Sequence, residues 1–201
     1  TRSEENAWDT EVLAWAVGMF PEHPNAAAWR QKLIEFYMNT LSAPQDKTDG
    51  TLVDGRPVKD WVVGANIHDD YTIENHGAYH FCYMACPLHS LSWGFEGLIG
   101  GGQNPPQALF HHYGDVWRWI KRGYLGDGRF AYLSGKDWPR YAYGLSFVLP
   151  ATVVAQIQFN DADARAIEKD RIATLEREQL MNADGSFYGG RFTRNALYGR
   201  M

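Results

Sequence analysis

Apolar residues recur along much of the chain at the three- and four-residue spacing of an α-helix. The first such stretch spans 5–20, and we expect its apolar stripe to face the core. That stripe consists of Trp8, Val12, Trp15 and Met19. A second stretch spans 25–41, and Pro21 and Pro24 between the two indicate where the first helix ends. The pair predicts an antiparallel helical hairpin.

Four more stretches have the same helical spacing. They span 73–98, 106–121, 141–159 and 162–181. An Asp-Gly-Xaa-Phe element follows the second and the fourth of these, at Asp127 and at Asp184, and weak repetition of this kind is typical of helical repeat proteins. The sequence therefore predicts an all-α fold whose helical hairpins form about half of an α/α toroid. We expect residues 1–201 to be a single helical-hairpin region of a larger toroid domain.

Two irregular segments interrupt the helical pattern, at 42–71 and at 123–140. A connection as long as the first, inside a compact domain, is usually either functional or disordered. Apolar residues such as Trp61 and Ile67 give it material to pack, so we expect an ordered functional loop.

The net charge and the lack of long apolar segments exclude some classes of binding partner. The formal net charge is -5 and no basic block occurs, which argues against nucleic acid or an anionic membrane as a partner. No segment approaches the roughly 18 to 20 apolar residues that span a bilayer. The chain begins at Thr1, which suggests a processed product, and we expect a periplasmic or secreted parent protein. Cys82 and Cys86 lie four apart and are expected to be two buried thiols.

Polar chemistry is densest at 68–80. We expect Asn75 and His76 on the first turn of the predicted helix 73–98, with His80 one turn later on the same face. A metal site built from His68, Asp69, Asp70 and His80 is an alternative, but this mixed ligand set names no particular metal, and we expect neither a metal nor a cofactor. In the doublet His111-His112, one ring is expected to pack and the other to face solvent.

Two ordered motifs resemble a known family. They are Asn75-His76-Gly77 after the long loop, and Asp127-Gly128-Arg129-Phe130 followed by Trp138-Pro139-Arg140-Tyr141-Ala142-Tyr143. Together they look like the toroid polysaccharide lyases of the heparinase II/III and alginate-lyase type, over about 8–149. The resemblance implies β-elimination on a uronic-acid-containing polysaccharide, with an acidic polysaccharide or oligosaccharide as the partner.

The same resemblance implies roles for individual residues. Asn75 would stabilise the charge that develops on the substrate carboxylate, and His76 would take the proton. Tyr141 or Tyr143 would serve as acid or base, and the sequence leaves open which of them faces the cleft. Residues implied in substrate binding are His80, Arg140, Trp61, Trp138 and Tyr71.

Two other functions remain open. A toroid glycoside hydrolase would need two positioned carboxylates, which Asp69 or Asp70 with Asp127 or Asp137 could supply. A non-catalytic glycan-binding or structural domain would use Asn75 and His76 only to pin a helix. In any of these, we expect the last hairpin to carry apolar surface that the remainder of the parent chain or self-association covers.

Overall fold

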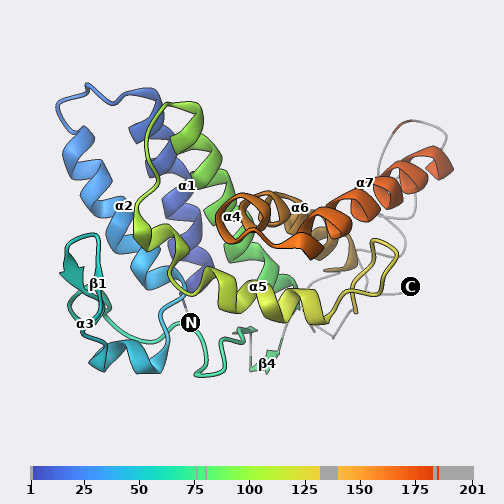
Figure 1. Ribbon diagram of the computed structural model, residues 1–201, viewed down its shortest axis with the longest axis horizontal. Helices are drawn as coiled ribbons and strands as arrows, with labels where there is room; N and C mark the ends of the chain where they lie inside the picture. Colours follow the sequence, from blue (N-terminus) through green and yellow to red (C-terminus); the bar gives the residue numbers. More distant parts are fainter. Residues whose placement is uncertain (1, 76, 80, 132–139, 183–184, 186–201) are drawn as a thin grey trace.

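Helices dominate the computed structural model, which describes residues 2–75, 77–79, 81–131, 140–182 and 185 (Figure 1). Helices make up 66% and strands 5% of the described structure, so the predicted all-α fold is confirmed. The strands form two two-stranded hairpins, one joining β1 to β2 and one joining β3 to β4. Among the described residues, no helix combines the length and the apolar character needed to cross a membrane.

Three antiparallel helical hairpins follow one another along the described chain. Their helices are α1 (Ser3–Met19) with α2 (Ala26–Thr40), α4 (Phe81–Gly100) with α5 (Tyr113–Arg122), and α6 (Arg140–Phe159) with α7 (Ala162–Asn182). The predicted order of hairpins is therefore confirmed in this part of the chain. The short helix η2 (Gln107–Phe110) lies between α4 and α5.

The first helices of the first two hairpins, α1 and α4, lie side by side and run parallel. The Cys86 Sγ atom contacts Glu4 Oε1 at 3.9 Å near the starts of both helices. Near their ends, a Cβ atom added to Gly18 would lie only 2.2 Å from the Gly97 carbonyl oxygen. Glycines on both helices thus let the two backbones approach closely.

The third hairpin continues the same arrangement. His89 in α4 contacts Phe147 in α6 with ring centroids 4.8 Å apart. Further along, the hydroxyl groups of Tyr113 in α5 and Ser92 in α4 share a hydrogen bond of 2.7 Å. The Tyr113 ring also stacks on Phe159 at the end of α6. The later parts of α4 and α6 therefore lie near each other, so α1, α4 and α6 run in one direction and begin at the same end of the molecule.

The apolar stripe predicted to bury α1 is wrong. Trp8, Val12, Trp15 and Met19 are 49%, 72%, 38% and 62% exposed. The buried side of α1 consists of small or medium-sized residues, namely Ser3, Ala7, Thr10, Ala14, Val17 and Gly18. Small residues such as Ala14 and Gly18 lie where α1 packs most closely on α4, and the Trp15 ring lies at the edge of this contact, against Gly97 of α4.

The described part of the connection between α2 and α4 is built from short elements. These are η1 (Pro44–Thr48), β1 (Leu52–Val53), β2 (Arg56–Pro57), α3 (Val58–Trp61), β3 (Glu74–Asn75) and β4 (Ala78–Tyr79). Two predicted helix bounds are therefore wrong. The predicted helix 73–98 begins only at Phe81, after a strand hairpin, and the predicted helix 106–121 is broken at His112, whose φ of 54° is left-handed.

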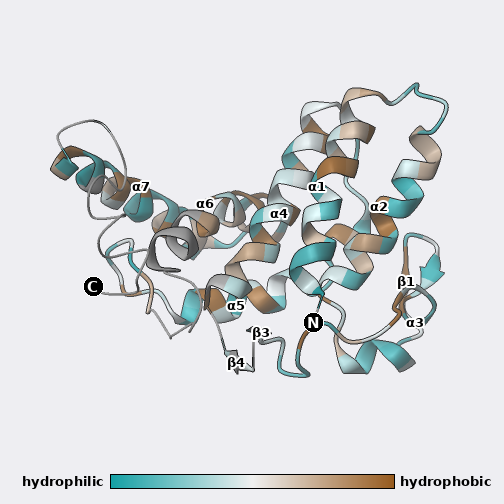
Figure 2. Ribbon diagram, turned by 180° about the vertical axis from the view of Figure 1, so that it is seen from behind, coloured by the Kyte–Doolittle hydropathy of each residue, from teal (hydrophilic) through white to brown (hydrophobic). Residues whose placement is uncertain are grey.

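Exposed apolar residues accompany the last hairpin, as expected. Ile157, Ile172, Leu180 and Met181 are all exposed. Figure 2 shows apolar and hydrophilic positions interspersed along α7, which extends away from the other helices. What covers this surface stays a prediction.

Candidate functional site

The irregular segments gather at the end where the parallel helices begin. In Figure 1, the start of α1, α3 and the β3–β4 hairpin lie in the lower part of the molecule, and the β1–β2 hairpin lies at its left side, beside α2. Because α4 and α6 run parallel to α1, their starts belong to this end as well. We call it the N-terminal face of the helix layer.

The motif Asn75-His76-Gly77 belongs to a strand hairpin. Asn75 is in β3 and pairs with Ala78 of β4, and Gly77 supplies a φ of +77° at the turn. Asn75 is therefore not on the first helical turn as predicted, because Gly77, two residues later, has the positive φ that a tight hairpin turn favours. The hairpin leads directly into α4 at Phe81.

Two histidines predicted near this motif cannot be placed with it. His76 and His80 lie outside the described residues. The side chain of Asn75 is also outside the described part, so only its backbone position in β3 is fixed.

The segment before this hairpin is pinned to α5. The Asp70 carboxylate accepts hydrogen bonds from the Thr72 backbone N–H at 2.9 Å and from the Thr72 hydroxyl at 2.6 Å. These bonds hold the pKa of Asp70 below its ordinary value. The indole N–H of Trp119 donates to the Asp70 carbonyl oxygen at 2.6 Å. His68 approaches the Glu74 carboxylate at 3.4 Å, which joins the two ends of the segment.

Tyr71 connects this segment to a buried cluster of ionisable groups. Its φ is 67°, and its half-buried ring packs against the His112 imidazole with centroids 4.8 Å apart. Tyr71 was predicted to contact substrate, and in this structure its ring contacts protein. The strained backbone is held by the surrounding bonds, including Tyr71 N–H to the His68 carbonyl at 2.9 Å.

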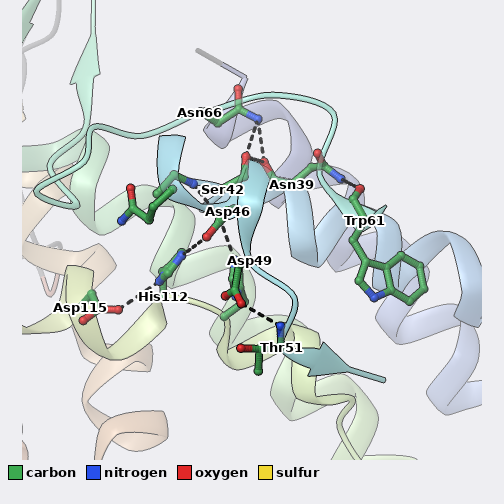
Figure 3. Close-up of polar contacts among 12 residues, drawn as sticks. Asn39, Ser42, Asp46, Asp49, Thr51, Trp61, Asn66, His112 and Asp115 are labelled. Atoms are coloured by element: carbon green, nitrogen blue, oxygen red, sulfur yellow. Dashed lines mark hydrogen bonds and ion pairs between the residues drawn. The ribbon is translucent and has the colours of Figure 1, made fainter. Parts of the chain in front are cut away.

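The buried cluster centres on the carboxylate of Asp46 in η1 (Figure 3). Its side chain is 1% exposed, and those of His111 and His112 are 8% and 14% exposed. His111 Nε2 lies 3.0 Å from Oδ2 and His112 Nε2 lies 2.8 Å from Oδ1 of this carboxylate. The Ala43 backbone N–H donates to Oδ2 at 2.8 Å. Asp46 therefore has partners for both of its oxygens.

His112 lies between two carboxylates. Its Nδ1 atom is 3.1 Å from Asp115 Oδ2, and Asp115 also pairs with Arg118. Burial lowers the pKa of His112, but Asp46 and Asp115 raise it by a larger amount, so the net pKa is above its ordinary value. Burial also raises the pKa of Asp46, and the bonds from His111, His112 and Ala43 outweigh it and hold that pKa well below its usual range.

The expectation for the His111-His112 doublet is wrong, because both rings are mostly buried and both meet Asp46. The left-handed backbone at His112 accompanies this arrangement of adjacent rings, whose centroids are 4.0 Å apart. The only local signal was the spacing of three between His112 and Asp115. Nothing in the sequence linked Asp46 to a histidine 65 residues later.

A separate cavity of about 580 Å³ opens between the start of α1, α2 and the segment after α3. Its lining includes three cationic side chains, from Arg2, Lys32 and Arg56, and two acidic ones, from Glu35 and Asp60. The amides of Asn6, Asn39 and Asn66 also line it.

Asparagines hold the wall of this cavity in place. The Asn39 amide donates to the Trp61 carbonyl oxygen at 3.0 Å, and its oxygen accepts from the Val63 N–H at 2.8 Å. The Asn66 amide donates to the Asn39 carbonyl at 2.7 Å, and its oxygen accepts from the Arg2 N–H at 2.8 Å (Figure 3). The start of α1 is thereby joined to the long connection.

Trp61, predicted to stack on sugar, lies in this wall and is only 6% exposed. Its indole N–H donates to the Val53 carbonyl at 2.9 Å, and the Arg56 guanidinium lies 4.7 Å from the ring centroid. Arg56 therefore covers one face of the ring, and a sugar could contact only the part of Trp61 that borders the cavity.

The other predicted site residues belong to the second irregular segment and to α6. Trp138 lies outside the described residues. Arg140, Tyr141 and Tyr143 are in the first turn of α6, and their side chains lie outside the described part. Their helix begins at the N-terminal face, the same end that carries the Asn75 hairpin.

Comparison of the chain with family models, with curated proteins and with solved structures gives no match.

Proposed function

We propose that this chain is the helical part of an α/α toroid that cleaves uronic-acid-containing polysaccharide by β-elimination. The observation that carries the proposal is the parallel run of α4 and α6. Each of these helices follows an irregular segment that holds one of the two lyase-like motifs. The Asn75 hairpin and the Arg140–Tyr143 turn therefore start from the same face of the helix layer.

The chemistry requires three groups near the scissile bond. His76 takes the proton from the carbon that bears the carboxylate, and a carbon–carbon double bond forms as the bond to the glycosidic oxygen breaks. Tyr141 or Tyr143 gives its proton to that leaving oxygen. Asn75 donates a hydrogen bond to the substrate carboxylate, where negative charge builds up during the reaction. One proton leaves the substrate carbon and one is delivered to the leaving oxygen, so the elimination needs no further reactant.

The net positive charge of the cavity lining favours an acidic sugar as the ligand. Its three cations outnumber its two acids by one, in a chain whose net charge is -5. Guanidinium groups such as those of Arg2 and Arg56 form paired hydrogen bonds with carboxylates. We propose that a neighbouring uronate of the polymer occupies this cavity while the reacting bond lies at the hairpin.

The test is incubation of the chain with polymers of different uronic acids, such as alginate, polygalacturonate and heparin-type glycosaminoglycans. Elimination adds a conjugated double bond, which absorbs in the ultraviolet, together with new reducing ends. His76→Ala should lower turnover by roughly 100-fold or more, and so should one of Tyr141→Phe and Tyr143→Phe. His23→Ala is the matched control, because this exposed histidine lies in the α1–α2 turn.

The outcomes separate the competing functions. New reducing ends without ultraviolet absorbance would identify a hydrolase, and binding without any turnover would identify a glycan-binding module. Equal activity of His76→Ala and His23→Ala would remove His76 from the mechanism. Circular dichroism on each variant keeps loss of fold apart from loss of chemistry.

A further inference from the structure

We propose that Asp46, His111 and His112 bind a divalent transition-metal ion of the zinc class. One ligand atom from each of the three residues lies within 4.8 Å of the other two. Two imidazoles with one carboxylate form a ligand set that suits zinc and the neighbouring first-row ions. This site is distinct from the residues proposed for elimination, and nothing in that mechanism uses it.

The hydrogen-bonding roles around His112 require a cation. Carboxylates accept hydrogen bonds and cannot donate them when ionised. His112 meets Asp115 through Nδ1 at 3.1 Å and Asp46 through Nε2 at 2.8 Å. Either both ring nitrogens carry protons, or a positive ion lies between Nε2 and Asp46. The second arrangement leaves Nδ1–H donating to Asp115, as metal-binding histidines usually donate to a carboxylate.

Further contacts hold the proposed ligands and their partner Asp115 in position. The Arg118 guanidinium pairs with Asp115, and the Ala43 N–H holds Oδ2 of Asp46 at 2.8 Å. Both histidines meet a carboxylate that is 1% exposed, which is an unusual place for an isolated charge.

The distances need little adjustment to receive an ion. Ligands about 2.1 Å from a metal lie about 3.0 Å apart at neighbouring octahedral positions, and about 3.4 Å apart at tetrahedral ones. The two imidazole–carboxylate distances are 2.8 and 3.0 Å. These two pairs therefore need to open by only a few tenths of an ångström, while the two imidazole nitrogens, which lie within 4.8 Å of each other, would close toward the same spacing.

The low exposure of all three residues points to a structural ion. The site joins η1, which follows α2, to the corner between η2 and α5. Tyr71 packs on His112, so the ion would also fix the segment that leads to the Asn75 hairpin.

The experiment measures zinc binding by the whole chain after treatment with a chelator. Calorimetric titration should give about one equivalent of zinc, and thermal unfolding should shift upward with added zinc. Cobalt should give the visible absorption bands of a site with nitrogen and oxygen ligands. His111→Ala and His112→Ala should each weaken zinc binding by roughly 100-fold or more, and Asp115→Asn by roughly 10- to 100-fold.

His68→Ala is the matched control, since this exposed histidine pairs with Glu74 outside the cluster and should leave zinc affinity unchanged. Should the ligand variants fail to fold, Asp115→Asn still tests the site, because Asp115 is not itself a ligand. Absence of zinc binding by the wild-type chain would overturn the proposal and leave a protonated His112. Binding that is lost in His68→Ala but kept in His112→Ala would overturn it as well.

Discussion

A single methyl group at Gly18 should weaken the contact between α1 and α4. An added Cβ would lie 2.2 Å from the carbonyl oxygen of Gly97 and 3.0 Å from its carbonyl carbon. A carbon and an oxygen in contact are normally about 3.3 Å apart, so the helices must separate by about 1 Å. Overpacking of this kind costs about 1 to 3 kcal/mol, and both offending atoms are backbone, which places Gly18→Ala at the upper end.

The assay is urea unfolding followed by circular dichroism. Gly18→Ala should lower the free energy of unfolding by about 2 kcal/mol or more, although alanine favours the helix itself by up to about 1 kcal/mol. Gly100→Ala is the control in the same helix pair, because a Cβ atom there meets nothing within 4 Å. It should leave stability unchanged or raise it slightly.

Equal stability of Gly18→Ala and Gly100→Ala would refute the close parallel packing of α1 on α4. The starts of α1 and α4 could then no longer be assigned to one face. The cavity at the start of α1 and the Asn75 hairpin before α4 could then no longer be placed at the same end of the molecule.

Two further predictions concern buried polar groups. Burial lowers the pKa of His89 to about 4, so the unfolded chain takes up a proton that the folded chain does not as pH falls from about 6.5 to 4. The free energy of unfolding therefore keeps its full value above pH 6.5 and is lower by about 3 kcal/mol at pH 4. Urea unfolding of His89→Gln across this range should lack this pH-dependent loss. A pH dependence equal to that of the wild-type chain would contradict the prediction. Trp117→Phe should cost about 2 to 3 kcal/mol, because the buried indole N–H donates to Asp161 at 3.0 Å. Trp93→Phe, at an exposed position, should cost less than about 1 kcal/mol in the same measurement, and equal losses would contradict the assigned bond.

Helical spacing predicted the all-α class and the order of the three hairpins, because the 3.6-residue period of apolar positions is a local property of the chain. The same period misidentified the buried side of α1. Trp8, Val12 and Met19 follow it well, yet the neighbouring α4 approaches on the side of Ala14 and Gly18. A period shows that two sides of a helix differ, and only the neighbouring helix decides which side is covered.

Local turn chemistry also competed with periodicity at two helix starts. Gly77 and the left-handed His112 shorten the helices predicted at 73–98 and 106–121, because positive φ angles favour turns over helix. Gly77 itself was visible in the sequence as a residue that adopts positive φ readily. His112 carries no such signal, and its ring contacts Asp46 and Tyr71 only in the folded chain.

The candidate sites differ in the same way, because some are local in sequence and others are formed only by tertiary contacts. The Asn75 motif and the Arg140–Tyr143 run are each contiguous in sequence, so a resemblance could be stated from the sequence alone. The pairing of Asp46 with His111 and His112 joins residues more than 60 positions apart, and the cavity draws on α1, α2 and the segment after α3. Each of those residues is unremarkable alone, and their charges acquire meaning only when folding removes them from water and brings them within a few ångströms of one another.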